Sequence, residues 1–204
     1  MSQPNPTEGR RTDPILCLVV DRAAVRGELA NCIAAAVAAG VDWVQIRERE
    51  LQGCALLAHA EEIAAAAREA AARRGARVKI FVNRRIDIAL ALAADGVQLG
   101  FDAVDPATAR RLLPAGAAIG ISTHHPDEVR AAPPGVDYAQ LAPIGQPLSK
   151  PHAGPYLGVR AVAEAADCGI PVIAQGGISA ANAAAIVAAG AAGIAVTGAI
   201  LSAP

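Results

Sequence analysis

Aromatic residues are scarce in this sequence: they make up 2% of its 204 residues, although 53% of the residues are hydrophobic. Alanine, valine, isoleucine and leucine therefore have to build the interior, and alanine favours helices because it loses no side-chain entropy in them. An excess of charge of one sign is also missing, since 18 Lys and Arg stand against 19 Asp and Glu. The sequence therefore predicts no broad basic surface for nucleic acid or for a membrane.

Cysteines are few, and the apolar segments are interrupted. The four cysteines form no CxxC pair and no metal-binding spacing with histidine: Cys17, Cys32, Cys54 and Cys168. They are expected to be free thiols in a reducing compartment. The stretch 177–200 is apolar, but glycines and Asn182 interrupt it, so a helix followed by a strand explains it better than a membrane span.

The first fourteen residues lack the apolar segment of a signal peptide. They are polar and rich in proline and charge, and they are expected to form a disordered N-terminal arm, residues 1–14. The remaining length suits one domain, residues 15–204. A cytoplasmic location follows from these features.

Short β-branched runs alternate with alanine-rich stretches along the whole chain. The predicted strands are Ile15–Val20, Trp43–Arg47, Val78–Asn83, Gly96–Leu99, Ala118–Ser122, Tyr138–Leu141, Val172–Gln175 and Gly193–Thr197. Continuous apolar strands indicate a parallel sheet covered by helices. Eight of them predict an α/β fold, a single (β/α)8 TIM barrel, rather than an open doubly wound sheet. Only residues 201–204 remain at the end, so the closing helix after strand eight is expected to be missing.

Glycine turns follow the last two predicted strands. Gly176 and Gly177 come after the seventh strand, and Thr197 and Gly198 come after the eighth. In TIM barrels this is a frequent phosphate-binding position, because backbone N–H groups approach an anion closely there. The four residues are therefore predicted to bind phosphate, with two ordinary tight turns as the alternative.

Two further segments carry cations at the same end of the barrel. Arg47 and Arg49 leave the second strand and are suited to a carboxylate or a phosphate, unless the segment is merely a solvated loop. The segment 143–158, which contains Ser149 and Lys150, is longer than a routine connection and is expected to be a binding loop. A lone lysine is more often exposed to solvent, so the prediction of a binding loop rests on the length of the segment rather than on Lys150.

Histidines follow the fifth strand, in Ser122-Thr123-His124-His125-Pro126. A histidine at the exit of a barrel strand is suited to proton exchange near neutral pH. His125 precedes proline and is expected to begin the helix, so His124 is the preferred catalytic candidate, with a structural histidine as the alternative. His59 lies within a predicted helix and is expected to be a surface or packing residue.

From about residue 15 to residue 200 the chain resembles the superfamily of thiamine phosphate synthases and thiazole tautomerases. The motifs are Q-I-R-E-R at 45–49, V-N-R-R-I-D-I-A-L at 82–90, A-D-G-V-Q-L-G at 94–100, G-I-S-T-H at 120–124, A-P-I at 142–144, Q-G-G-I at 175–178 and A-V-T-G-A-I at 195–200. The resemblance implies substrate contacts from Gln45, Arg47, Arg49, Asn83, Ser122, Ser149 and Lys150.

The chain departs from the synthase pattern at the positions of the metal-binding residues. Synthases hold a diphosphate with Mg²⁺ through acidic residues after strands three and four, where this chain has Arg84 and Ala103. A guanidinium in that place repels the cation, so no metal and no other cofactor is expected, and Mg²⁺ enters only if the synthase alternative holds. Arg49 in place of the family lysine, and a histidine after strand five, resemble the tautomerase branch.

Three hypotheses follow. The leading one is an isomerase, a thiazole tautomerase that aromatises a carboxythiazole phosphate, with His124 carrying the proton. The second is a thiamine phosphate synthase, a transferase whose diphosphate site is rebuilt from Arg47, Arg49, Arg84 and Lys150. The third is a barrel that binds a thiazole or thiamine phosphate without turnover. In each case the partner is a small phosphorylated heterocycle, and a homodimer is expected to cover the last face of the barrel.

Overall fold

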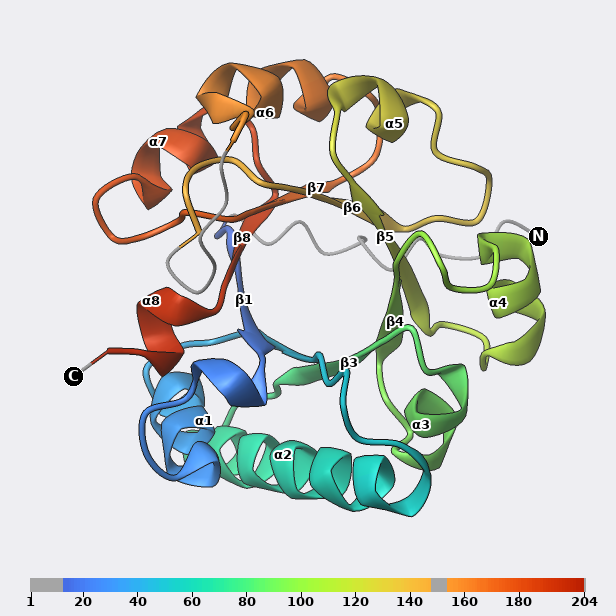
Figure 1. The fold of residues 1–204 in the computed structure, drawn as a ribbon, viewed down its shortest axis with the longest axis vertical. Helices are drawn as coiled ribbons and strands as arrows, with labels where there is room; N and C mark the ends of the chain where they lie inside the picture. Colours follow the sequence, from blue (N-terminus) through green and yellow to red (C-terminus); the bar gives the residue numbers. More distant parts are fainter. Residues whose placement is uncertain (1–12, 148–153, 204) are drawn as a thin grey trace.

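Eight parallel strands close into a barrel in the order in which they occur in the chain (Figure 1). The computed structural model describes residues 13–147 and 154–203. The strands are β1 Ile15–Val20, β2 Trp43–Ile46, β3 Lys79–Asn83, β4 Gly96–Leu99, β5 Ala118–Thr123, β6 Tyr138–Leu141, β7 Val172–Gln175 and β8 Gly193–Val196. Strand β1 pairs with both β2 and β8, which closes the barrel. The predicted TIM barrel is confirmed.

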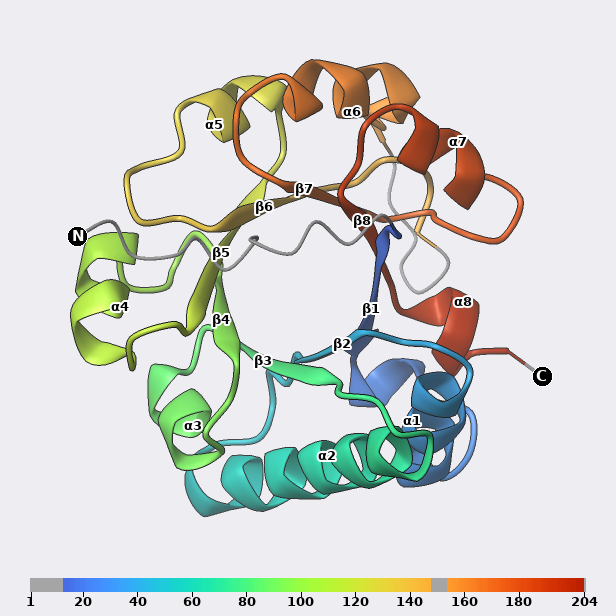
Figure 2. The same cartoon turned by 180° about the vertical axis from the view of Figure 1, so that it is seen from behind.

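Helices surround the strands on the outside of the barrel (Figures 1 and 2). They are α1 Leu29–Ala38, α2 Gly53–Arg73, α3 Ile86–Ala91, α4 Pro106–Leu112, α5 Pro126–Arg130, α6 Gly158–Ala166, α7 Ala183–Ala188 and α8 Gly198–Leu201, with a 3-10 turn at Arg22–Ala24. None in the described part of the chain combines the length and the apolarity needed to cross a bilayer.

Alanines let the helices lie close against the strands. In α2 the buried face is formed by Ala60, Ala64, Ala67 and Ala71, each at most 2% exposed. Their spacing of three and four residues puts them on one side of the helix. Packing of this face together with Val44 and Ile80 of the neighbouring strands forms part of the largest hydrophobic core cluster.

The end of the chain differs from the sequence-based expectation. A closing helix was expected to be missing, but one helical turn, α8, follows β8. Leu201 in this turn is 1% exposed, and α8 contacts α1. The Ser202 hydroxyl donates to the Ala24 carbonyl at 2.9 Å. A turn this short forms because apolar burial and tertiary hydrogen bonds hold it, which helical periodicity in the sequence does not reveal.

The amino ends of the strands enclose an aromatic cluster. The rings of Trp43 and Phe81 lie 4.5 Å apart between centroids, and Tyr138 lies 5.2 Å and 5.7 Å from them. Gly96 and Gly120 make room for these rings, since a Cβ atom would lie 2.6 Å from Phe81 and 2.2 Å from Tyr138. The scarce aromatics thus fill one end of the barrel interior.

Predicted and observed boundaries differ by a few residues. Strand β2 ends one residue before Arg47, and β5 extends one residue further than predicted, to Thr123. The predicted arm, residues 1–14, lies outside the described residues except for Asp13 and Pro14. Ser149 and Lys150 also lie outside them.

Candidate functional site

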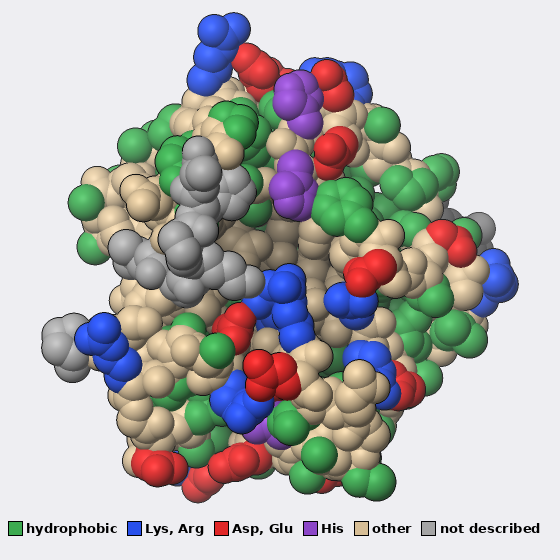
Figure 3. Space-filling view, viewed as in Figure 1, with side chains coloured by type: hydrophobic (Ala, Val, Ile, Leu, Met, Phe, Trp, Pro, Cys, Tyr) green, Lys and Arg blue, Asp and Glu red, His purple; other side chains and the backbone are tan. Residues whose placement is uncertain are grey.

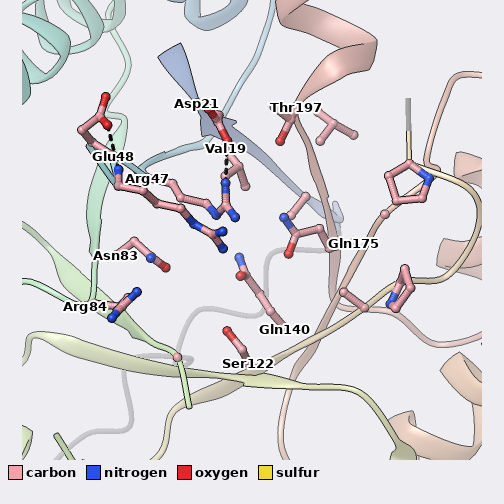
Figure 4. Close-up of a pocket in the computed structure, with 18 of the residues that line it drawn as sticks. Val19, Asp21, Arg47, Glu48, Asn83, Arg84, Ser122, Gln140, Gln175 and Thr197 are labelled. Carbon is pink, nitrogen blue, oxygen red and sulfur yellow. Dashed lines mark hydrogen bonds and ion pairs between the residues drawn. The ribbon is translucent and has the colours of Figure 1, made fainter. Parts of the chain in front are cut away.

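A cavity of about 840 Å³ opens at the carboxyl ends of the strands. Figure 3 shows the hollow in this face, with basic side chains in it and histidines beside it. In Figure 4, Arg47 and Asn83 reach toward the centre from β2 and β3, while Gln175 and Thr197 lie on the other side. The cavity lies at the strand ends, where the sequence predicts the site.

Arg47 is the most enclosed cation of the cavity. It directly follows β2, its side chain is 17% exposed, and its guanidinium pairs with the Asp21 carboxylate at 2.5 Å (Figure 4). Burial lowers the pKa of Arg47, and the neighbouring charges of Arg49 and Arg84 lower it as well, whereas Asp21 acts in the opposite direction. Three guanidinium groups therefore lie close enough to repel one another.

Glu48 holds the loop that carries two of these arginines. Its carboxylate accepts hydrogen bonds from the N–H groups of Arg49 and Glu50, both at 2.7 Å, and pairs with Arg22 at 3.1 Å. Burial alone raises the pKa of Glu48, but the hydrogen bonds outweigh it and hold the pKa below its usual range. His59 of α2 lies 3.9 Å from the same carboxylate.

Arg84 has an unusual backbone conformation. Its φ is 67°, in the left-handed region that non-glycine residues rarely adopt. The Arg85 N–H donates to the Asn83 carbonyl at 2.8 Å, which closes a strained three-residue turn around Arg84. The Arg84 side chain pairs with Asp102 and lines the cavity.

Amide side chains form a layer beneath the arginines. The Gln140 amide donates to Gln45 at 2.5 Å, and the Gln45 amide donates to Asn83 at 3.4 Å. The Gln98 amide donates to the Ser122 hydroxyl at 3.1 Å. Gln45 is 2% exposed and lies below the cavity lining, so it supports lining residues such as Gln140 and Asn83 rather than lining the cavity itself.

The two glycine turns lie side by side on the cavity wall. Gly176 and Gly177 have φ values of 90° and 66°. A Cβ atom on Gly177 would lie 2.3 Å from the Gly145 backbone, so this position has no room for a side chain. Thr197 and Gly198 also line the cavity. This arrangement suits a phosphate group, whose oxygens accept hydrogen bonds from backbone N–H groups.

Aromatic rings stand at the rim. His124 is exposed, lines the cavity and packs against Phe101, with ring centroids 5.0 Å apart. Phe101 is 74% exposed, which is unusual for an aromatic side chain. His125 instead caps α5, because its Nδ1 accepts from the Asp127 N–H at 3.2 Å.

The acidic residues of the cavity do not fit a carboxylate-bound magnesium ion. Magnesium requires several oxygen ligands in octahedral geometry. Asp21 and Asp102 are each paired with an arginine, and Glu48 is bound to backbone N–H groups. No group of three or more His, Cys, Asp or Glu side chains suited to a metal occurs within residues 13–147 and 154–203.

Sequence reasoning placed most of the predicted residues at one cavity but missed others. The lining includes Arg47, Arg49, Asn83, Ser122, His124, Gly176, Gly177, Thr197 and Gly198. It also includes Asp21, Phe101, Gln140 and Gln175, which were not predicted to bind substrate. A signal for the glutamines was present: β2, β4, β6 and β7 each carry one glutamine near the carboxyl end of an otherwise apolar run.

A closed barrel with two glycine turns and an arginine cluster at its mouth is typical of TIM barrels that bind phosphorylated ligands. The sequence profile of the TMP-TENI family, described as thiamine monophosphate synthase, matches residues 16–200, and the chain belongs to this family.

Individual relatives are similar over most of the chain. A thiamine-phosphate synthase of Methanoculleus marisnigri is 41% identical, covering 91% of this chain and 87% of that protein. The bifunctional ThiM/ThiE protein of Symbiobacterium thermophilum is 45% identical over 85% of this chain, which spans only 35% of that longer protein. The structure of a thiamine phosphate pyrophosphorylase from Pyrococcus furiosus superposes with a TM-score of 0.75 at 28% identity, over 93% of this chain and 88% of that one.

These relatives overturn the leading sequence-based hypothesis. The chain was expected to be a thiazole tautomerase, but the similar proteins carry the synthase name, including one of Azorhizobium caulinodans that is 38% identical. The isomerase prediction is therefore wrong. The departures behind it are the charge at the metal positions, Arg49 and the histidine after strand five, and they do not outweigh the similarity to synthases over most of the chain.

Proposed function

We propose that this protein is a transferase that joins a pyrimidine diphosphate to a thiazole phosphate, the reaction that its resemblance to thiamine phosphate synthases implies. One observation carries the proposal beyond the family: a single cavity has two different regions suited to anions. The glycine turns after β7 and β8 suit a monophosphate. The arginines after β2 and β3 suit a group of higher charge.

The proposed reaction forms one bond and breaks one. The bond between a carbon of the pyrimidine substrate and a diphosphate oxygen breaks, and its electron pair leaves on the diphosphate. The nitrogen of the thiazole ring supplies the electron pair for the new carbon–nitrogen bond. Cationic groups that face the diphosphate stabilise the charge developing on it.

Side chains elsewhere in the cavity have positioning roles in this proposal. The condensation moves no proton between two carbons, so His124 has no proton to carry and is assigned instead, with Phe101, to the rim that contacts a heterocycle. Ser122 and Asn83 lie deeper, where their hydrogen-bonding groups face the cavity. Holding both substrates in one cavity converts their encounter into an effectively intramolecular step.

The test is a direct assay of the purified protein with both substrates. Formation of thiamine phosphate and pyrophosphate in equal amounts supports the proposal, and omission of either substrate is the control. Binding of both substrates without any product contradicts it and favours the non-catalytic binding barrel. The homodimer and the cytoplasmic location expected from the sequence stay predictions, and sedimentation velocity at micromolar protein concentration tests the first.

A further inference from the structure

The arginine side of the cavity contains more positive charge than its own carboxylates match. Arg47 pairs with Asp21 and Arg84 pairs with Asp102. Arg49 lines the same cavity, and it forms no ion pair with any residue of 13–147 or 154–203. The third nearby carboxylate, Glu48, is bound to Arg22 and to backbone N–H groups. This side of the cavity is therefore suited to an anion.

The arginines also raise one another's energy in the absence of an anion. Arg47 is partly enclosed, with 17% of its side chain exposed, and the nearby positive charges of Arg49 and Arg84 lower its pKa. An anion among the three guanidinium groups relieves this repulsion. Guanidinium groups also hold phosphate oxygens through paired hydrogen bonds.

The backbone at Arg84 indicates that its position is functionally important. A left-handed, three-residue turn is strained for any residue with a side chain, and glycine relieves that strain. Strained backbone of this kind concentrates at functional sites, where the surrounding structure imposes it. Here the turn brings the Arg84 side chain to the cavity, on the same side as Asn83 (Figure 4).

We propose that Arg47, Arg49 and Arg84 bind a diphosphate group directly and take the place of a divalent metal ion. The identity of the diphosphate carrier rests on the proposed function, but the anion site itself does not. In the condensation, the three guanidinium groups stabilise the electron pair that leaves on the diphosphate oxygen. The protein then needs no divalent cation, because its own side chains neutralise the leaving group.

Calorimetric titration of inorganic pyrophosphate into the purified protein tests this inference without any turnover. We expect an affinity in EDTA that is at least as high as in Mg²⁺. Binding that requires Mg²⁺ overturns the inference. If thiamine phosphate forms only with Mg²⁺, the inference is overturned but the proposed function stands. If pyrophosphate binds without metal and no product forms, the inference stands and the proposed function fails.

Variants assign the binding to these residues. Arg84→Gln and Arg49→Gln should each weaken pyrophosphate binding in EDTA by roughly tenfold or more, since each removes a charge-assisted hydrogen-bond partner. The matched control is Arg160→Gln, which removes one positive charge from a side chain that is 92% exposed on α6. Unchanged affinity in both cavity variants, or an equal loss in the control, contradicts the assignment.

A charge reversal gives a second, independent readout. Arg84→Asp replaces the cation that pairs with Asp102 by a carboxylate, so pyrophosphate binding in EDTA should fall further than in Arg84→Gln. Added Mg²⁺ should then restore part of it, because carboxylate oxygens bind this ion. If pyrophosphate binding requires Mg²⁺ in the wild type but not in Arg84→Asp, the result is the opposite of the one expected and overturns the inference.

Discussion

The two sides of the cavity differ in the groups that they offer to an anion. On the β7–β8 side, backbone turns at Gly176-Gly177 and Thr197-Gly198 line the wall. On the β2–β3 side, long charged side chains do so, held by ion pairs and by Glu48. The glycine side depends on the course of the main chain, whereas the arginine side depends on charge and on the side chains that position it. The two sides should therefore fail under different perturbations.

The largest effect is expected on the glycine side. Gly177→Ala should destabilise the protein by about 3 kcal/mol and abolish measurable binding of a thiazole phosphate, because left-handed strain and overpacking add. The φ of Gly177 is 66°, and a Cβ atom would lie 2.3 Å from Gly145. Thermal unfolding and titration calorimetry measure the two effects.

A second glycine separates strain from overpacking. Gly75 has a φ of 65°, and a Cβ atom added there has nothing within 4 Å. Gly75→Ala should therefore cost only the strain, about 1 kcal/mol, and leave phosphate binding unchanged. If both variants lose the same stability and both bind phosphate normally, the close contact at Gly177 has no role in the site.

On the arginine side, the next largest effect concerns Glu48. Glu48→Gln should lower stability at neutral pH by about 1–2 kcal/mol, because the hydrogen bonds to the carboxylate lose their charge assistance. The folded pKa of Glu48 lies below its usual value. Its contribution is thus complete above the unfolded pKa of about 4.3 and is lost as the pH falls through the folded pKa.

Unfolding temperatures of wild type and Glu48→Gln between roughly pH 3 and pH 7 check this expectation. The difference between the two proteins should stay constant above about pH 5 and shrink at lower pH. A difference that grows as the pH falls has the wrong sign and contradicts the role assigned to Glu48.

A smaller effect is expected at the rim between the two sides. Phe101→Ala should raise the KM of the heterocyclic substrates by roughly fivefold, the scale of one aromatic contact. Pyrophosphate affinity should not change, because Phe101 carries no charge. Phe101→Trp should restore the KM. An equal loss of pyrophosphate binding in Phe101→Ala contradicts a specific role in holding the heterocycle.

The smallest effect comes from salt. Arg84 and its partner Asp102 are 39% and 65% exposed, so dissolved ions screen the arginine side. Raising the salt concentration from about 0.05 to 0.5 M should weaken pyrophosphate binding by about threefold and phosphate binding at the glycine turns by less. Equal weakening of both ligands removes the distinction between the two sides.

The fold was predictable because its signals are local. Each strand is a short, mainly apolar run, most of them ended by glycine or a polar residue, and β1, β4, β6 and β7 have the predicted bounds. The one-turn helix α8 was not predictable, because only its burial against α1 makes it form. The left-handed turn at Arg84 was not predictable either, since glycine is the residue that usually marks such a conformation.

The site was predictable in position but not in full composition. The TIM-barrel rule led to Arg47, His124 and the glycine turns, since strand ends can be read from the sequence. The buried pair of Gln45 and Gln140 depends on register across the barrel, and these residues lie 95 positions apart. The reaction was mispredicted because the prediction rested on single departures such as Arg84 and His124, whereas proteins similar over most of the chain are named synthases.

The aromatic cluster at the amino ends of the strands determines from which side ligands can reach the cavity. Phe81 and Tyr138 are 1% and 3% exposed, and with Trp43 they block the barrel axis opposite the mouth. Both substrates of the proposed condensation therefore enter the cavity, and both products leave it, through the opening at the carboxyl ends of the strands. If the proposed condensation takes place here, pyrophosphate bound among the arginines has to leave through this opening before the next diphosphate can bind.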